Sequence, residues 1–558
     1  MSSSGLSRRS LLRRGALGAG VLAAGPTLTR AAFGADAVGR TVPGEMLSYA
    51  RVRPRTLTQA LALAEFDDTH RLMADGTMEL LLWPGDETRL KRLGVDYQVT
   101  QPYRGPDLTA GARLSGLAPQ PGERTDYRHY ADYVTDLQKL ATDHPKHARM
   151  FEFPETTLEG RKVFGIEIAD DIARAVTDGR PTFWVDGAHH AREWPSSEYT
   201  MMFAFDLLQS YGKDRRVTAL LKKIRVVVVP IVNADGFVHS REASPVHNPA
   251  LNNNLAFNVA GLESGWRKNK RSFTDSLYTA GGTSSRLNAD AHGTDPNRNY
   301  PFFWGGEGGG SDPTSQTYGG AEPFSEPEAR NIAGGMKARQ VTAYLTNHTS
   351  GQLCMRPWGY TTDESPDDAL QDDLGEQMCS FNEYRNQIGL SLYPTAGTSR
   401  DWSYGALRTI VYTFEHNQAF HPPYAANIPS TYEINRPAWL LLAEAAADPR
   451  NHGVITGRVV TRGGGPASGA VVTLTKSFKS PVAEDVLARR DGSVPETITT
   501  TARTDRNGRF TIHCNPSTRP TTIQDKRGKE FWTVKVGSFS TKVYVDRGDK
   551  VNLGTVRL

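Results

Sequence analysis

Four consecutive valines within residues 224–232 constrain the fold of this chain more than any other feature. A β-branched run without polar alternation is typical of a strand buried on both faces, as in a mostly parallel sheet. Further strands are predicted at 182–185, 341–346 and 409–414, and apolar periodicity predicts a long helix over 196–210. We therefore expect an α/β fold whose mixed, mostly parallel sheet is covered by helices on both faces.

Smaller units are expected on either side of this sheet, because 558 residues are too many for one compact core. Before it, residues 38–122 combine a small α/β unit with a Pro/Gly-rich linker; the unit is predicted to have strands at 49–52, 78–82 and 97–99 and helices at 57–64 and 87–93. After residues 123–450, which hold the main α/β domain, the segment 451–558 contains short runs typical of a β-sandwich, at 453–460, 470–475, 496–504, 510–514, 531–536 and 542–546.

The first 37 residues have the pattern of an export signal. Arg8 and Arg9 precede a short apolar stretch over 16–24 and a small-residue region near Ala35. This pattern resembles a twin-arginine signal, although a basic N-terminus also arises by chance. The apolar stretch is too short to span a bilayer. We expect an exported, extracytoplasmic protein without a transmembrane segment in its mature form.

Cysteine and charge content limit the possible ligands. The three cysteines, Cys354, Cys379 and Cys514, form neither a disulfide framework nor a zinc–thiolate spacing, so any metal must be held by His and carboxylates. From residue 453 onward 18 Lys and Arg face 9 Asp and Glu, so this segment is basic. It either contacts an anionic surface or is simply a basic soluble domain. Aromatic and basic residues are not interleaved in this sequence, so we do not expect it to bind nucleic acid.

His190 and Glu193 form an H-x-x-E pair where the predicted strand 182–185 gives way to the predicted helix 196–210. A His and a Glu at this spacing can bind one metal ion, and Pro195 fits the first helical turn. This motif is weak alone, but an ordered series of further motifs follows it. They are N-A-D-G at 233–236, W-R-K at 266–268, D-P-N-R-N-Y at 295–300, S-E-P-E at 325–328, N-H-T-S at 347–350, Tyr393, D-W-S-Y at 401–404 and T-F-E at 413–415.

This series resembles the A/B-type zinc metallocarboxypeptidases. Weaker resemblances flank it: a carboxypeptidase-type pro-segment before it and a transthyretin-like domain after it. The resemblance implies that His190, Glu193 and His348 hold one zinc ion per chain and leave a fourth position open for water, as catalytic zinc sites do.

Further roles follow from the resemblance. Glu415 would be the general base that activates the water at the zinc, unless it lies at a solvent edge. Arg267 would stabilise the oxyanion, unless it and its neighbours Lys268, Lys270 and Arg271 only form a solvated basic face. Asp295 would orient the first zinc histidine from behind.

Recognition of a free C-terminal carboxylate requires a bidentate arginine. By resemblance Arg298 and Asn297 form this anchor, Tyr393 closes over it or simply packs, and Arg192 contacts substrate upstream of the cleaved bond. The resemblance also implies that Arg400, just before Asp401, lies at the floor of the specificity pocket. Arg400 predicts a preference for acidic C-terminal residues, unless it pairs with Asp401 or points to solvent.

Ser350 replaces a tyrosine of the pancreatic-type enzymes, so the upstream subsite should be more open. The chain is thus expected to be a secreted zinc peptidase that cleaves the C-terminal residue from peptides. An amidase on the same scaffold, acting on cell-wall peptides or acyl-amino acids, and an inactive peptide-binding protein are the alternatives. Whether the pro-segment-like unit inhibits, assists folding or is removed stays open.

Overall fold

The computed structural model describes residues 47–73, 77–83, 85–103, 124–242, 264–271, 293–313, 315–391, 393–483, 493–520 and 530–558. The predicted export signal over 1–37 and the predicted linker beyond residue 103 lie outside these ranges. Within them, no helix combines the length and the apolar character needed to cross a membrane.

An eight-stranded mixed sheet forms the centre of the molecule, in the order β11-β10-β12-β9-β7-β8-β6-β5. Neighbouring strands run parallel from β12 through β9 and β7 to β8 and between β10 and β11, and antiparallel elsewhere. The strands are β5 (Ala148–Glu152), β6 (Phe164–Ile168), β7 (Thr182–Gly187), β8 (Arg225–Val229), β9 (Val341–Thr349), β10 (Leu353–Arg356), β11 (Arg385–Ile388) and β12 (Ile410–His416). The valine run lies in β8, and every residue of β7, β8, β9 and β12 is buried, which confirms the predicted sheet.

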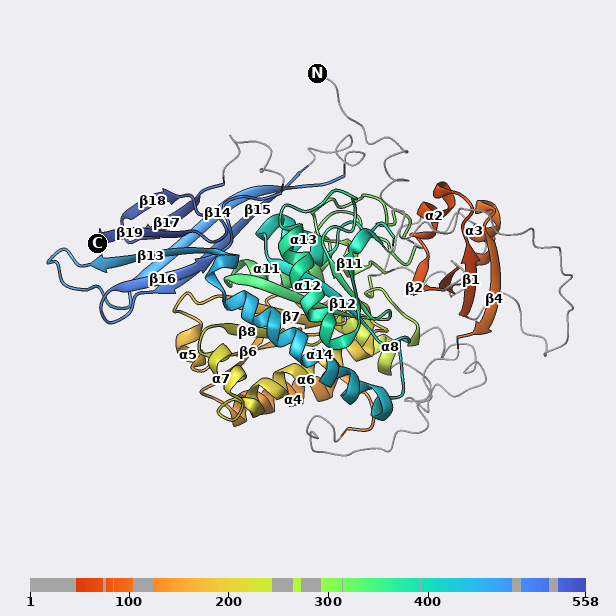
Figure 1. Cartoon of the computed structure of the whole chain (residues 1–558), viewed down its shortest axis with the longest axis horizontal. Helices are drawn as coiled ribbons and strands as arrows, with labels where there is room; N and C mark the ends of the chain where they lie inside the picture. The colour runs from red at the N-terminus through yellow and green to blue at the C-terminus, as the bar shows by residue number, and fades with distance from the viewer. Residues whose placement is uncertain are drawn as a thin grey trace, which may run out of the picture.

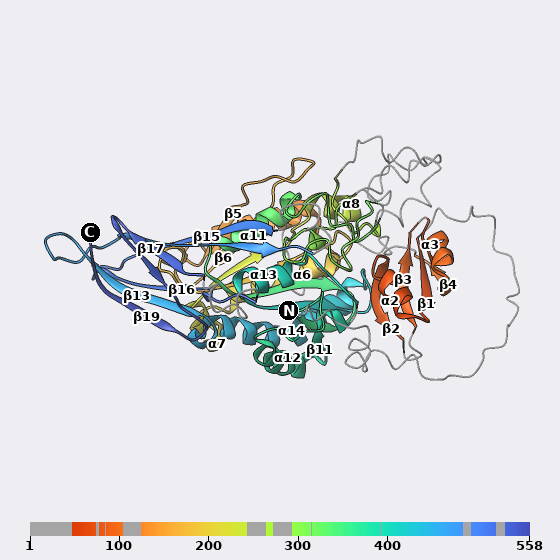
Figure 2. The same cartoon turned by 90° about the horizontal axis from the view of Figure 1, so that it is seen from above.

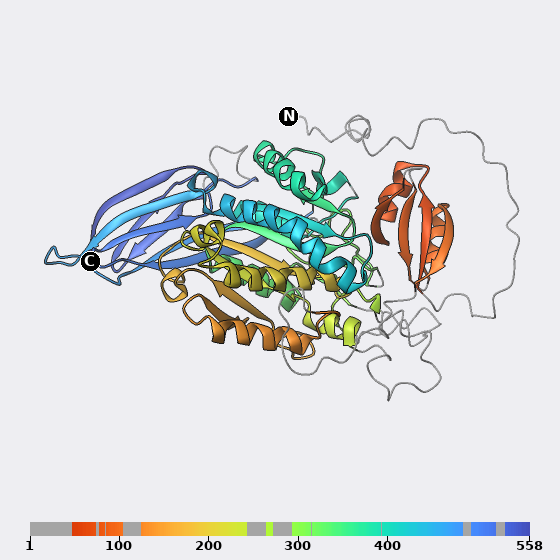
Figure 3. The ribbon, with the colours of Figure 1, turned by 60° about the horizontal axis from the view of Figure 1, so that its bottom comes forward.

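Helices cover both faces of this sheet (Figures 1 and 3). In Figure 1, α4 and α6 lie below the sheet and α11 and α13 above it. The helices are α4 (Tyr130–Asp143), α5 (Ile172–Ala175), α6 (Trp194–Ser210), α7 (Arg215–Leu221), α8 (Ala234–Glu242), α11 (Pro327–Lys337), α12 (Asp368–Asn382), α13 (Ser399–Leu407) and α14 (Tyr424–Ala447), with short 3-10 turns η4 (Pro296–Arg298), η5 (Gly389–Ser391) and η6 (Pro449–Asn451). Pro195 lies in the first turn of α6, as predicted.

The N-terminal unit has its own four-stranded sheet, in the order β2-β3-β1-β4. Its elements are β1 (Ser48–Arg53), α2 (Leu57–Leu63), β2 (Asp67–Leu72), β3 (Met78–Leu82), α3 (Asp86–Leu93) and β4 (Asp96–Pro102). Ala50, Leu63, Leu80 and Leu90 are among its fully buried residues. Three strands and two helices were predicted; the edge strand β2 was missed. Figure 2 shows the unit at one end of the molecule.

The C-terminal region forms two sheets at the opposite end, ordered β16-β13-β19 and β15-β14-β17-β18 (Figures 1 and 2). The strands are β13 (Gly453–Val460), β14 (Val471–Pro481), β15 (Ser493–Arg503), β16 (Arg509–Cys514), β17 (Trp532–Val536), β18 (Phe539–Val543) and β19 (Lys550–Arg557). Buried and exposed residues alternate along β14 and β15, and the predicted β-sandwich is confirmed.

The strand predicted over 542–546 was wrong. Val536 pairs with Phe539 across a two-residue hairpin turn whose first residue, Gly537, has φ of +56°, a conformation that glycine adopts without strain. This tight turn makes β18 begin at Phe539 and end at Val543. A further strand, β19, was missed and pairs in parallel with β13.

Candidate active site

The three predicted zinc ligands and Glu415 gather at the carboxyl ends of neighbouring parallel strands. Gly187, the last residue of β7, pairs with Asn347 on β9, and His348 pairs with Glu415 on β12. His190 follows β7 in the loop that leads to α6. Ligand sites of open α/β sheets lie at this edge. His348 and Glu415 were expected just after their strands; both instead lie within the last residues of β9 and β12.

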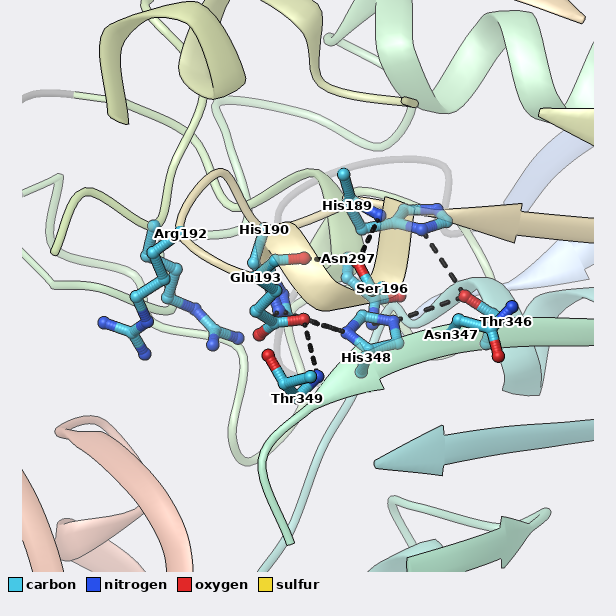
Figure 4. A network of polar contacts seen from close by, with 12 residues as sticks. His189, His190, Arg192, Glu193, Ser196, Asn297, Thr346, Asn347, His348 and Thr349 are labelled. Atoms are coloured by element: carbon cyan, nitrogen blue, oxygen red, sulfur yellow. Dashed lines mark hydrogen bonds and ion pairs between the residues drawn. The ribbon is translucent and has the colours of Figure 1, made fainter. Parts of the chain in front are cut away.

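The side chains of His190, Glu193 and His348 converge on one point (Figure 4). His190 Nδ1 lies 2.7 Å from Glu193 Oε1, and His348 Nδ1 lies 2.9 Å from Glu193 Oε2. The two Nδ1 atoms are 3.2 Å apart. Zinc bonds to His nitrogen and carboxylate oxygen at about 2.0–2.2 Å, so ligand atoms at these separations can share one ion. The donor set therefore fits zinc.

Asp295 holds the far side of His190. Its Oδ1 lies 3.2 Å from His190 Nε2, which leaves Nδ1 directed at the metal position. Its Oδ2 accepts from Arg267 Nε and Nη2 at 3.1 and 2.8 Å. Burial opposes ionisation of Asp295, but Arg267 and His190 hold its pKa well below the usual range. One carboxylate thus orients both a metal ligand and the predicted oxyanion arginine.

Glu415 is buried against these ligands. It is 4 % exposed, which excludes the solvent-edge alternative. Burial, followed by the charge of Glu193, raises the pKa of Glu415 well above its usual value, while Arg267 and Arg400 oppose this shift. A carboxyl group in such a place is suited to accept and return a proton.

Eight predicted site residues line one cleft: His190, Arg267, Asn297, Arg298, His348, Tyr393, Arg400 and Glu415. Thr413, the first residue of the T-F-E motif, also lines it, although no role was predicted for this residue. Four further lining residues, Met355, Gly389, Thr395 and Thr398, were not predicted, because they are uncharged and lie outside the motifs. The cleft combines a metal position with several guanidinium groups.

Arg298 and Asn297 occupy η4, directly after Asp295. Arg298 Nε donates to the carbonyl of Gly308 at 2.8 Å and Nη1 donates to the carbonyl of Asn297 at 2.9 Å. Asn297 Oδ1 accepts from Ser399 N at 2.9 Å. Both side chains are therefore held in place by the backbone around them. Tyr393 lies nearby, and burial raises its pKa above the usual value.

Arg400 lies in the first turn of α13 and lines the cleft, so it does not point to solvent. Its Nε donates to Asp401 Oδ1 at 2.9 Å and its Nη2 to Thr395 Oγ1 at 3.3 Å. The pairing with Asp401, left open above, is thus present. A Cβ atom at Gly389 would come within 2.2 Å of Arg400 Nη2, so glycine makes room for this guanidinium.

Arg192 is not among the cleft-lining residues. Its guanidinium instead contacts the N-terminal unit. The guanidinium is fully buried, donates to both carboxylate oxygens of Asp67 on β2, and lies 4.1 Å from the centre of the Phe420 ring. Ser350 Oγ donates to the carbonyl of Thr69 at 3.1 Å. The upstream position that Ser350 was expected to open is therefore covered by β2.

The alternative of a solvated basic face around Arg267 is wrong. Lys268 is buried and its Nζ donates to the carbonyls of Pro313 and Ser315 at 2.8 and 2.9 Å. Arg271 Nε donates to Glu326 Oε1 at 2.7 Å. Arg267 itself is 3 % exposed, and its carbonyl accepts from Ala191 N at 2.9 Å, which ties it to the metal-binding loop.

The fold and this cleft define a class, the zinc-dependent hydrolases with an α/β sheet and a His–Glu–His metal site. A zinc carboxypeptidase family model matches residues 133–438, more than half of the chain. The chain belongs to the zinc carboxypeptidase family, and it is a zinc-dependent metallocarboxypeptidase, an enzyme acting on peptide C-termini.

Relatives and solved structures agree with this assignment. Carboxypeptidase A4 of Mus musculus is 27 % identical over 329 residues, which span 57 % of this chain and 69 % of that protein. Carboxypeptidase B of Astacus astacus is 31 % identical over 292 residues, 50 % of this chain and 82 % of that protein. The carboxypeptidase A structure from Helicoverpa armigera superposes with a TM-score of 0.56 at 19 % identity, covering 73 % of this chain and 99 % of that one, which shows a common fold.

Proposed function

We propose that this enzyme hydrolyses the last peptide bond of its substrates with Glu415 as the general base and Arg298 as the anchor of the free carboxylate. The observation that supports this most directly is the register of the sheet, which pairs Glu415 with the metal ligand His348. Both line the same cleft as Arg298. A substrate held by its terminal carboxylate would thus present its last peptide bond beside the metal position and the base.

Each protein group has a distinct task in this proposal. Zinc, when bound, polarises the scissile carbonyl and lowers the pKa of water. Glu415 accepts the proton from the attacking water and delivers it to the leaving amine. Arg267, fixed by Asp295, stabilises the negative charge that develops on the carbonyl oxygen. Arg298 and Asn297 bind the carboxylate, and Tyr393 closes over it.

Hydrolysis of a blocked dipeptide by the zinc-loaded enzyme tests this assignment. Glu415→Gln should lower kcat by about a thousandfold, because general acid–base catalysis contributes of that order, while zinc content stays unchanged. Glu444→Gln, which alters an ion pair with Arg216 on the far helices, is the matched control and should retain full activity. Chelation should abolish turnover and added zinc restore it. Turnover that survives in Glu415→Gln would refute the mechanism.

The specificity pocket supports a preference for Glu or Asp at the substrate C-terminus. The Arg400 guanidinium lines the cleft, and a substrate carboxylate would form a charge-assisted pair with it. Its contact with Asp401 uses Nε, at one edge of the planar group. Release of Glu from peptides should exceed release of Phe and Lys, and Arg400→Asp should move the preference toward Lys and Arg. Faster release of Phe by the unaltered enzyme would contradict the preference.

An amidase acting on acyl-amino acids or cell-wall peptides is the second candidate. The observation that favours it is that Arg298 and Asn297 line the cleft. In their proposed role they would bind the free carboxylate, which peptides and acyl-amino acids share. Comparison of kcat/KM for a peptide, an N-acyl-glutamate and a cell-wall tripeptide distinguishes the two functions.

We also propose that the N-terminal unit is an inhibitory pro-segment. Its strand β2 ion-pairs with Arg192 through Asp67 and bonds to Ser350 through Thr69, both on the upstream side of the cleft. The negative charge of Asp68 contributes to the raised pKa values of Glu415 and Tyr393, so β2 lies within electrostatic reach of the site. An extended strand in this position would exclude the substrate chain.

Export by the twin-arginine route, supported by the pattern around Arg8 and Arg9, would make this a secreted enzyme. The basic C-terminal sandwich, which we propose is transthyretin-like, would then contact an anionic cell surface. Mass spectrometry of secreted material would locate the mature N-terminus. Sedimentation with anionic vesicles at low and high salt would test the surface contact.

A further inference from the structure

The C-terminal sandwich places a buried carboxylate against the helix that carries Arg400. Glu496 on β15 is 4 % exposed and accepts from Trp402 Nε1 on α13, which lies 3.2 Å from each carboxylate oxygen. Lys337 Nζ, at the end of α11, lies 2.7 Å from Glu496 Oε2, and Ser480 Oγ donates to Oε1. Two of these three donors belong to the α/β domain. Glu496 is therefore a polar link between the sandwich and the specificity side of the cleft.

Trp402 connects Glu496 to the segments that carry Arg298 and Arg400. It is fully buried, stands two residues after Arg400, and its ring packs 5.5 Å from the ring of Tyr300. Tyr300 lies two residues after Arg298 in the chain. Its N–H donates to the carbonyl of Gly397, which stands just before α13. The Trp402 ring thus packs α13, which carries Arg400, against the chain segment that carries Arg298.

The end of β14 supports the same region from a second direction. Phe303 N donates to the carbonyl of Pro481 at 2.8 Å, and Ala483 N donates to the carbonyl of Trp304 at 3.0 Å. These bonds fix the loop that continues to Gly308, whose carbonyl accepts from Arg298 Nε. Arg519, also in the sandwich, donates to the carbonyl of Gly405 on α13. The sandwich therefore contacts the loop that supports Arg298 and the helix α13 that carries Arg400.

We propose that Glu496 is a positioning residue that sets the orientation of α13 through Trp402, so that the C-terminal sandwich takes part in selecting the residue to be released. This inference rests on the proposed roles of Arg298 and Arg400 in binding the substrate C-terminus. Glu496 touches neither zinc ligands nor Glu415, so it acts on binding of the released residue and not on the bond-breaking step.

The physical reason lies in the buried charge. Loss of the Glu496 carboxylate leaves the partly exposed Lys337 ammonium and the buried Trp402 N–H without this acceptor. The first turn of α13 must then shift to regain partners. Displacement of a binding group by about 1 Å can reduce catalytic efficiency by as much as a hundredfold.

The test compares steady-state kinetics of zinc-loaded variants on peptides ending in Glu and in Phe. Glu496→Ala should raise KM by about tenfold and change the ratio of kcat/KM values for the two peptides, with kcat and zinc content unchanged. Glu496→Gln keeps an acceptor oxygen for Trp402 and should lie closer to the unaltered enzyme. Asp505→Asn is the control and should change nothing, because within the part of the chain that the structure describes Asp505 bonds only inside its own turn, to Asn507 N and Arg509 N.

Trp402→Phe provides an independent second variant, because it keeps an aromatic ring at this position and removes the N–H donor together with part of the indole. It should change KM and the substrate ratio in the same direction, and combined with Glu496→Ala it should add little. Unchanged KM and an unchanged ratio in Glu496→Ala or in Trp402→Phe, with an active unaltered enzyme, would overturn the inference. A zinc-loaded unaltered enzyme that releases no C-terminal residue would instead refute the proposed function.

Discussion

The N-terminal unit and the C-terminal sandwich flank the α/β domain but join it in different ways. The N-terminal unit has a core of its own and meets the domain through a small apolar cluster: Leu47, Leu81, Trp83, Tyr103, Ala191, Trp266 and Phe420. The sandwich has no separate core among the described residues, since Ile455, Val472 and Trp532 belong to the same continuous hydrophobic cluster as Phe183 and Val227 of the central sheet.

This difference indicates which part can be removed. A unit with its own core and only a small apolar contact can leave without exposing the main core of its partner, whereas a shared core holds together only as a whole. The N-terminal unit is therefore suited to a temporary role and the sandwich to a permanent one. The predictions below test this contrast, beginning with the largest effect.

Deletion of residues 449–558 should abolish folding of the enzyme. Each large apolar side chain exposed at the cut would cost about 1.5–3 kcal/mol, and a few such losses exceed the usual 5–15 kcal/mol of stability. Circular dichroism and size-exclusion chromatography should show an unfolded or aggregated product. Deletion of residues 1–123 should leave a folded, cooperatively unfolding enzyme. If the chain that lacks the sandwich unfolds at the original temperature, the sandwich is not part of a shared core and the contrast with the N-terminal unit is wrong.

Asp67→Ala should release the N-terminal unit from the cleft. It leaves the Arg192 guanidinium buried without its carboxylate partner, a change that costs about 3–5 kcal/mol when a buried pair is broken. The uncleaved chain should gain about a hundredfold in kcat/KM, approaching the chain that lacks residues 1–123.

Asp96→Ala is the matched control for this experiment, because it breaks an exposed ion pair with Arg55 inside the same unit. It should leave the activity of the uncleaved chain as it was. If Asp67→Ala behaves like Asp96→Ala, while removal of residues 1–123 raises activity, the buried pair does not hold the unit in place.

Sequence patterns predicted the four inner strands β7, β8, β9 and β12 because their signal is local, whereas the outer strands β5, β6, β10 and β11 were missed. The valine run of β8 and the apolar periodicity of α6 each report burial within one element. The zinc ligands and Glu415 were predicted from an ordered set of short motifs. For the strands and helix, neighbouring residues carry the information; for the site, the resemblance carried by motifs spread from residue 190 to residue 415 does.

The contacts between units were not predicted, because their partners are distant in sequence. Asp67 and Arg192 are 125 residues apart, and Trp402 and Glu496 are 94 residues apart. The strand β2, with the sequence Asp-Asp-Thr-His-Arg-Leu, has no apolar alternation, and among the described strands it pairs with β3 alone. The two consecutive acids after Phe66 do not indicate by themselves which residues they contact.

Asp367 should make attachment of the sandwich sensitive to acid. Its carboxylate accepts from Arg408 in the α/β domain and from Arg547 in the sandwich, each at 2.8 to 3.0 Å. Burial opposes ionisation, but these arginines lower the pKa of Asp367 to about 2. A lowered folded-state pKa means that the stabilisation is present above the unfolded pKa of about 3.9 and is lost as the pH falls toward 2.

The ionised Asp367 carboxylate should contribute about 2 kcal/mol to the free energy of unfolding at neutral pH. Thermal unfolding between pH 2 and 7 should show this loss between about pH 4 and pH 2 in the unaltered enzyme, and Asp367→Asn should unfold at lower temperature at neutral pH and lack this component. Asp143→Asn, which alters an exposed pair with Lys139, should keep the acid-dependent loss. An identical pH profile for Asp367→Asn and the unaltered enzyme would contradict the role of this carboxylate.

Ser350→Ala should have the smallest effect, because it removes a single hydrogen bond to the carbonyl of Thr69 on β2. One such bond contributes about 1 kcal/mol, so activity of the uncleaved chain should rise by about fivefold, with the unfolding temperature of the chain lacking residues 1–123 unchanged. Ser210→Ala, which removes a bond to Asp206 on α6, is the control. If Ser350→Ala instead activates the enzyme as strongly as Asp67→Ala, the unit docks as one cooperative surface, and its attachment resembles that of the sandwich more than its separate core suggests.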